Sequence, residues 1–161
     1  MASPAHIAEH PLHPILVPLP IGLWVFSLAC DFVYAFGWGD AIWDDIAFYT
    51  MAGGLIGAFL AAVPGLIDYS SLADPRVKRV ATLHMGMNLA LIALVAVNLW
   101  LRAQYPGHTG IPLALSVLSI LLLGITGWLG GELVYIHCVG VVPHHDIARM
   151  ARAKRRKMRI V

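Results

Sequence analysis

The chain has 161 residues, of which 59% are hydrophobic and 12% are charged, and its formal net charge is +2. Soluble globular domains carry about 25% charged residues, and the mean hydropathy of this chain is +0.75. The composition therefore excludes a soluble globular protein and indicates an integral membrane protein of one domain.

Four apolar stretches are each long enough for a membrane-spanning helix, which requires about 20 residues. In chain order they cover residues 15–36, 46–67, 80–101 and 112–134. Because the connections between them are short, the sequence predicts an all-α fold: a polytopic membrane protein with four transmembrane helices in an up-down bundle. We assign residues 1–148 to this transmembrane domain and residues 149–161 to a basic tail.

The basic residues predict the orientation of the helices. Of eleven Lys and Arg residues, seven lie between 149 and 159, three lie between 76 and 79, and Arg102 follows the third span. The positive-inside rule then places both termini and the second loop in the cytoplasm of a bacterium whose inner membrane holds the protein. The loops 38–45 and 102–110, the latter with Arg102 and His108, are then expected outside. The tail is expected to lie on anionic lipid headgroups, and we expect no nucleic-acid partner.

The first span begins with two histidines and contains a carboxylate. His10 and His13 belong to the run His-Pro-Leu-His-Pro, and Asp31 lies farther along the same span. An Asp inside a span costs at least about 2.5 kcal/mol on insertion scales, so Asp31 is expected to face a partner or a hydrated cavity. It either serves the function or is simply satisfied by Ser27 and Asn98.

The later spans bring further ionisable residues to the predicted cytoplasmic side. Asp68 closes the second span, His84 lies one turn into the third, and His137 lies at the end of the fourth. With His13 they would form one polar cluster at one membrane surface. Small residues at helical spacing favour close helix packing, and the glycine faces offer a surface for a homo-oligomer.

This cluster suggests a bound redox cofactor. Imidazole ligates haem iron and transition metals, and a bis-histidine b-type haem takes one ligand from each of two facing helices. We expect His84 to pair with His13 or with His137, and the same three histidines are the candidate ligands of a transition metal ion. Gly130 lies seven residues before His137 and about two turns deeper, where it would leave room for a flat macrocycle. Helix packing is its alternative role.

Three further residues are expected to support this site. His10 and Asp68 would hold the imidazoles in place through hydrogen bonds or accept protons. Asp31 is the third candidate for such a supporting or proton-relay role.

Several motifs connect the chain to a known family. They are His10-Pro11-Leu12-His13-Pro14, the segment 16–22, Gly65-Leu66-Ile67-Asp68, His84 and the segment 127–137. From His10 to Val142 the chain resembles a family of predicted four-helix bacterial membrane proteins classed as a domain of unknown function. Some members look to be fused to a Rieske iron-sulfur domain, and the resemblance therefore implies a redox setting with a quinone or a Rieske-type protein as partner. In this chain the basic tail stands at that place, and Cys138 stands where members commonly have glycine.

The sequence thus predicts a membrane protein that binds b-type haem, or another redox metal, near the cytoplasmic surface and serves electron transfer. Two other functions stay open. One is a proton or metal-ion carrier or channel, in which Asp31 and Asn98 continue a polar path outward. The other is a non-catalytic subunit that anchors or assembles a redox complex. Whether the protein is an enzyme is left open by these residues.

Overall fold

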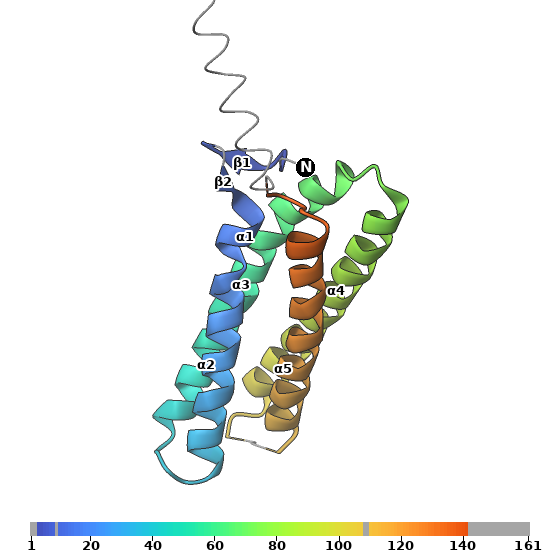
Figure 1. Ribbon diagram of the computed structural model, residues 1–161. Helices are drawn as coiled ribbons and strands as arrows, with labels where there is room; N and C mark the ends of the chain where they lie inside the picture. Colours follow the sequence, from blue (N-terminus) through green and yellow to red (C-terminus); the bar gives the residue numbers. More distant parts are fainter. Residues whose placement is uncertain (1–2, 9, 108–109, 142–161) are drawn as a thin grey trace, which may run out of the picture.

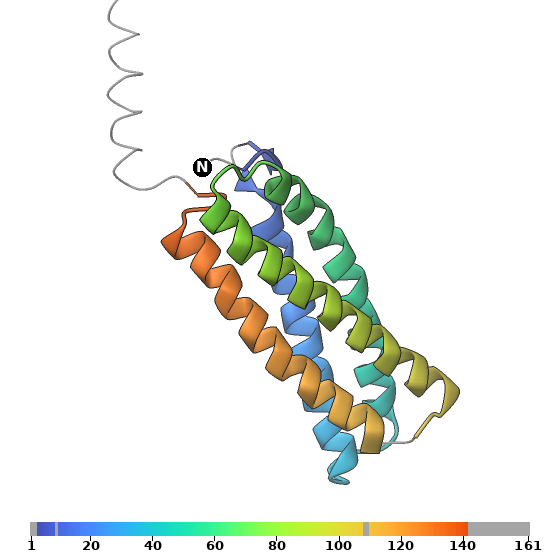
Figure 2. The same ribbon diagram turned by 90° about the vertical axis from the view of Figure 1, so that its right-hand side faces the viewer.

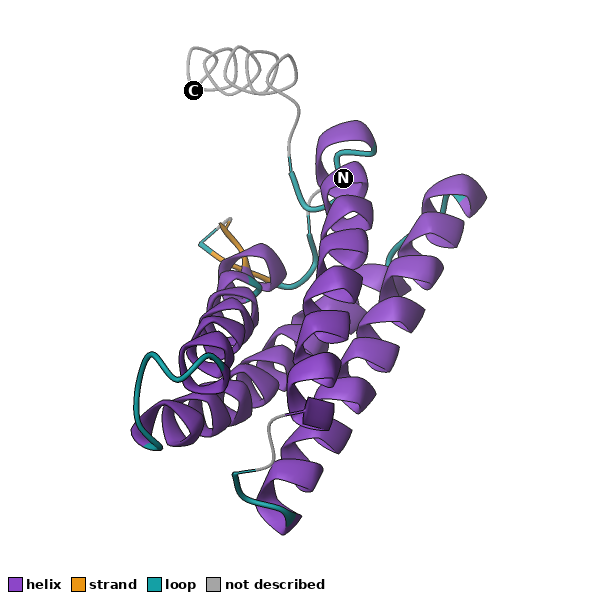
Figure 3. Cartoon of the chain, turned by 90° about the horizontal axis from the view of Figure 1, so that it is seen from below, coloured by secondary structure: helices purple, strands orange, loops and turns teal. Residues whose placement is uncertain are grey.

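The computed structural model describes residues 3–8, 10–107 and 110–141, and helices make up most of this part of the chain (Figures 1 and 3). The elements in chain order are β1 His6–Ile7, β2 His10–Pro11, α1 Leu12–Leu16, α2 Pro18–Ala35, α3 Ile42–Ser70, α4 Pro75–Gln104, α5 Gly110–Gly131 and the π-helical turn η1 Glu132–Ile136. The predicted basic tail, the predicted domain end at residue 148, and His108 lie outside the described residues.

Four segments of the described chain are long and apolar enough to cross a membrane. They are Leu12–Ala35, Ile42–Ser70, Pro75–Gln104 and Gly110–Ile136. The first of them joins α1 and α2, because Val17 between the two helices also has helical backbone angles. The predicted all-α fold with four spans is thereby confirmed.

The third span extends beyond the apolar stretch from which it was predicted. Asp74 caps the start of α4, where its side chain accepts a hydrogen bond from the backbone N–H of Arg76 at 2.8 Å, and Pro75 takes the first helical position. At its other end α4 continues through Arg102, which is only 7% exposed. The prediction that Arg102 belongs to a loop is therefore wrong, because hydropathy records where the chain is apolar and not where a helix ends.

The helices form two antiparallel hairpins that pack side by side (Figures 1 and 2). The first hairpin comprises α1, α2 and α3, and the second comprises α4, α5 and η1; residues 71–74 connect them. Contacts of α2 with α5 and of α3 with α4 close the bundle, so that α2 and α4 lie diagonally and run in the same direction. This up-down arrangement brings the start of α1, the end of α3, the start of α4 and the end of α5 to one end, which we call the histidine end.

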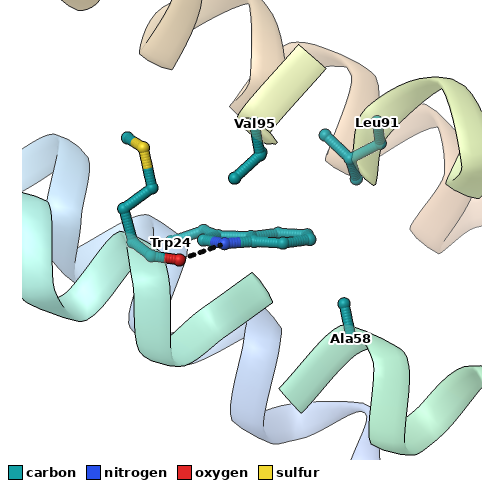
Figure 4. Packing of buried hydrophobic residues seen from close by; sticks show 5 residues of the cluster. Trp24, Ala58, Leu91 and Val95 are labelled. Carbon is teal, nitrogen blue, oxygen red and sulfur yellow. Dashed lines mark hydrogen bonds between the residues drawn. The ribbon is translucent and has the colours of Figure 1, made fainter. Parts of the chain in front are cut away.

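The core of the bundle is centred on Trp24. Its indole lies between Leu91 and Val95 of α4 on one side and Ala58 of α3 on the other (Figure 4). The indole Nε1 donates a hydrogen bond to the backbone carbonyl of Met51 at 3.2 Å. The polar edge of the ring is thus satisfied inside an apolar interior, as burial of tryptophan requires.

Large apolar side chains cover the outside of the bundle. Leu60 and Val63 of α3 are 54% and 63% exposed, and Leu118 and Leu121 of α5 are 51% and 62% exposed. In water such a surface would be a strong aggregation liability, whereas in a bilayer it faces hydrocarbon. These helices are thus built to contact lipid.

Candidate functional site

His13 is held against the backbone of α3. Its Nδ1 lies 2.8 Å from the carbonyl oxygen of Ala61. Because a carbonyl oxygen can only accept, Nδ1 carries a proton, and in the neutral imidazole Nε2 then has the lone pair. The ring fits there because residue 65 is glycine: a Cβ at Gly65 would lie 2.8 Å from Nδ1.

His84 is held against α5 in the same way. Its Nδ1 lies 2.9 Å from the carbonyl oxygen of Thr126, and a Cβ at Gly130 would lie 3.1 Å from Cε1 of the imidazole. The side-chain amide of Asn88 donates to Nε2 at 3.1 Å, which also requires that Nε2 is unprotonated. In both histidines the carbonyl acceptor lies four residues before the glycine, and the same nitrogen keeps its lone pair.

These two histidines lie at the same end of diagonal helices. His13 lies in α1, at the start of the first span, and His84 lies in the first turns of α4, at the start of the third. The predicted pairing of His13 with His84 across the bundle is thus consistent with their placement. A Cβ at Gly130 would lie against the imidazole of His84, so this glycine leaves room for that ring, and its predicted role beside a macrocycle stays a prediction.

His137 has a different environment. Its backbone N–H donates to the carbonyl of Glu132, five residues earlier, at 3.1 Å, and its Nε2 lies 3.7 Å from Glu132 Oε1. The π-helical turn inserts an extra residue and so rotates everything beyond it by roughly 100°. The seven-residue argument that put Gly130 and His137 on one face is therefore wrong, since it assumed a regular α-helix.

A three-histidine metal centre is not formed by the described residues. Within that part of the chain, no three His, Cys, Asp or Glu side chains are grouped as metal ligands would be. The predicted set of His13, His84 and His137 is thus not brought together as a three-ligand group, and the pair of His13 and His84 is the arrangement that shares one geometry.

Asp68 and His10 bind the N-terminal segment. Asp68 Oδ1 accepts hydrogen bonds from Ser3 Oγ at 2.5 Å and from the backbone N–H of Ala5 at 3.3 Å. His10 Nδ1 lies 2.7 Å from the carbonyl oxygen of Ala8 and is exposed. The two bonds of Asp68 attach Ser3 and Ala5 to the end of α3, whereas the contact of His10 is local, and none of the three involves His13 or His84.

Asp31 is satisfied by a residue other than its predicted partners. Arg102 Nη2 donates to Asp31 Oδ2 at 2.7 Å, and Arg102 Nη1 lies 3.3 Å from Asp44 Oδ1. Asn98 contributes indirectly by accepting from Arg102 Nε at 3.2 Å. Ser27, the other predicted partner, donates instead to the carbonyl of Ala47.

Arg102 escaped prediction as a site residue because its position was expected to be a loop. The signal that could have found it is spacing, since Arg102 follows His84 at the same interval at which Asp31 follows His13. This interval corresponds to about five complete turns of an α-helix. Each charge therefore lies on the same helix face as its histidine.

A surface pocket lies away from the histidines. It has a volume of about 310 Å³ and is lined by Leu101, Tyr105 and residues 110–112, at the opposite end of the bundle. Its lining is almost entirely apolar. The candidate site is defined by the histidine pair and its hydrogen bonds.

Four apolar spans with a polar cluster at one end define a multi-pass membrane protein. The chain belongs to the family described as Predicted membrane protein (DUF2231), which matches residues 9–143. No curated protein and no solved structure matches the chain. The family assignment covers all four spans, and its description states no activity.

Proposed function

We propose that this membrane protein binds a b-type haem with His13 and His84 as axial ligands and serves electron transfer. The observation that carries the proposal is the shared geometry of the two histidines. Each donates Nδ1–H to a backbone carbonyl and keeps its Nε2 lone pair, on helices that lie across the bundle from each other.

That donor set fits an iron porphyrin. A histidine that ligates a metal through one nitrogen usually donates from the other to a carbonyl or carboxylate, which fixes the ring and raises its basicity. Ala61 and Thr126 supply such carbonyls. When bound, the haem would supply reversible one-electron chemistry at a potential set by its ligands and surroundings.

Asn88 would have to give up one contact to make room for a ligand. Its amide now donates to Nε2 of His84 at 3.1 Å. It also donates to the carbonyl oxygen of His84 and to Thr126 Oγ1, both at 2.8 Å. The two amide hydrogens are thus shared among three acceptors, and the two shorter bonds would keep the side chain paired if Nε2 bound a metal.

The predicted orientation would put this site at the cytoplasmic surface, where a quinone or a Rieske-type protein are candidate electron partners. The carrier reading is less favoured, because Asp31 and Asn98, which would continue a polar path, are both bound to Arg102. A transition metal ion on the same pair of histidines is the alternative cofactor.

The test is the absorption spectrum of detergent-purified protein expressed with ample haem supply, first oxidised and then reduced with dithionite. We expect a Soret band that sharpens on reduction, and its loss in His13→Ala and in His84→Ala. His137→Ala is the matched control, because His137 pairs with Glu132 in its own helix, and it should keep the band.

Two results would count against this assignment. Colourless wild-type protein would reject the haem, and metal analysis with proton-flux measurements would then decide whether the histidine pair holds a transported ion. A band that survives His13→Ala but disappears in His137→Ala would support a bound haem but would assign His137, and not His13, as its second axial ligand.

A further inference from the structure

The two hairpins are structurally equivalent. In the first span of each hairpin, His13 corresponds to His84 and Ser27 corresponds to Asn98, because the difference in residue number is the same for both pairs. In the second span of each hairpin a second constant difference relates three pairs of residues. They are Gly65 and Gly130, Ala47 and Pro112, and Ala61 and Thr126. Corresponding residues also make corresponding hydrogen bonds. The bond from Ser27 to the carbonyl of Ala47 matches the bond from Asn98 to the carbonyl of Pro112, and the two contacts from histidine to carbonyl match each other.

Burial follows the same correspondence. Nine pairs of matched positions are buried in both hairpins, and they are Pro20 and Leu91, Trp24 and Val95, Ser27 and Asn98, Asp31 and Arg102, Ala47 and Pro112, Met51 and Ser116, Gly54 and Ser119, Ala61 and Thr126, and Asp68 and Leu133. Equivalent hairpins that run in the same direction are related by a pseudo-two-fold axis along the bundle, as in parallel repeats of other membrane proteins. Few of the matched residues are identical, so the repeat lies in position and contact more than in sequence.

One matched pair departs from equivalence in a specific way. Asp31 and Arg102 occupy corresponding positions but carry opposite charges, and they contact each other across the axis at 2.7 Å. Their side chains are 4% and 6% exposed. The matched hydrogen bonds described above each stay within one hairpin, whereas this ion pair joins the two.

The ion pair and the histidine pair are linked by helix geometry. On both helices the charge follows the histidine at the same interval, which is about 27 Å along the axis. If Asp31 and Arg102 are level, His13 and His84 are therefore level too. A slip of one turn between the hairpins would separate the histidines by about 5.4 Å along the axis.

We propose that the Asp31–Arg102 ion pair sets the register between the two hairpins and thereby holds His13 opposite His84. Apolar packing in lipid gives little register specificity, because aliphatic side chains and lipid tails are equally apolar. A charge moved out of contact inside the bundle, by contrast, loses its partner where water cannot replace it. The register holds without a cofactor; only its consequence for ligand binding rests on the proposed function.

Cross-linking in the full chain tests this register without any cofactor. The starting protein carries His13→Cys and His84→Cys, with Cys30→Ala and Cys138→Gly removing the native thiols. A short bis-maleimide joins the two new thiols when they are opposite. Mild acid then cleaves Asp74–Pro75, the one Asp-Pro bond in the sequence, which lies between the hairpins. Cross-linked chains stay as one band and unlinked chains give two fragments.

We expect efficient cross-linking in this protein and a loss of at least about fivefold when Asp31→Arg or Arg102→Asp places like charges at the axis. The double variant with both changes restores opposite charges in exchanged positions, and its cross-linking should rise above that of both single variants. Recovery is expected to be incomplete, because position 102 then carries a negative charge beside Asp44. Asp45→Arg is the matched control, because Asp45 is exposed and only one position from the Arg102 partner Asp44; it should leave cross-linking unchanged.

A second reporter separates slipping from unfolding. Moving the second cysteine from position 84 to position 80 or 88 places it one turn away on α4 in either direction, and the cross-link to position 13 should rise at one of these two positions as the cross-link at 84 falls. Unchanged cross-linking in both single charge variants would overturn the proposal, as would a folded double variant that does not recover. If neither single variant accumulates, recovery of the double variant decides in the same way.

The two proposals can fail separately. Charge-dependent cross-linking in a protein whose wild type is colourless would keep the register and reject the haem. A haem spectrum that is unaltered by the single charge variants, with cross-linking also unaltered, would keep the haem and reject the register.

Discussion

The two hairpins have the same arrangement of helices and backbone contacts but differ in the side chains around the histidine. In the first hairpin, His13 packs against the backbone of α3, at the carbonyl of Ala61 and at Gly65. In the second, His84 also contacts the side chains of Asn88 and Thr126. The comparison indicates that backbone docking defines the repeat, while side chains added to one half specialise it. His84 therefore has more hydrogen-bond partners than His13.

The largest expected effect comes from breaking the ion pair at one side only. Arg102→Met leaves Asp31 and Asp44 without their cation and should lower the free energy of unfolding by about 3–5 kcal/mol. Asp31→Asn should cost less, because Arg102 keeps Asp44 at 3.3 Å. Thermal or denaturant unfolding in detergent measures both.

The control for these variants is Arg76→Ala. Arg76 is exposed at the start of α4 and takes part in the cap through its backbone N–H, so its change should stay within about 0.5 kcal/mol. If Arg102→Met proved no worse than Arg76→Ala, the ion pair would not join the hairpins energetically. If Asp31→Asn proved the more costly, Asp44 would not be a real partner.

The next largest effect is expected at the two glycines that contact the histidine rings. Gly65→Ala and Gly130→Ala each place a methyl group against an imidazole, at 2.8 Å from His13 Nδ1 and 3.1 Å from His84 Cε1. Overpacking of this kind costs about 1–3 kcal/mol, and we expect the larger loss at Gly65, where the contact is closer and involves the hydrogen-bonding nitrogen. Unfolding in detergent again gives the values.

Gly127→Ala is the matched control, because a Cβ there has no neighbour within 4 Å among the described residues. It should be neutral or stabilise α5 by up to about 1 kcal/mol through helix propensity. Equal losses at all three glycines would mean that backbone flexibility, and not the space for an imidazole, explains these residues.

The four spans could be predicted from the sequence because hydropathy reports directly on long apolar helices. The grouping of His13, Asp68, His84 and His137 at one end followed from counting spans and needed no contact information. Their partners could not be predicted in the same way. Asp68 binds Ser3 and Ala5, in a segment that shows no hydrophobic periodicity to place it.

Two local features escaped prediction for separate physical reasons. The ion pair joins two residues that are far apart in the sequence, and Arg102 lies just past the apolar window, so a helix end defined by hydropathy excludes it. The π-helical turn at Glu132–Ile136 breaks the 3.6-residue period, and no composition rule marks such a turn. Both errors come from treating the helix as regular and its ends as known.

The smallest expected effect concerns the ends of the second helix in each hairpin. α3 is followed by Ser71, whose φ is −84°, whereas the chain after η1 turns through Cys138 with a φ of +52°. A residue with a Cβ pays about 1–2 kcal/mol in this left-handed region, and glycine does not. Cys138→Gly should therefore raise the free energy of unfolding by about 0.5–1 kcal/mol, after allowing for the greater freedom of glycine in the unfolded chain.

Cys138→Ala keeps the Cβ and removes only the thiol, so it should bring no gain. Equal stabilities of the glycine and alanine variants would assign the effect to the sulfur, and the two ends would then differ in chemistry and not in backbone strain.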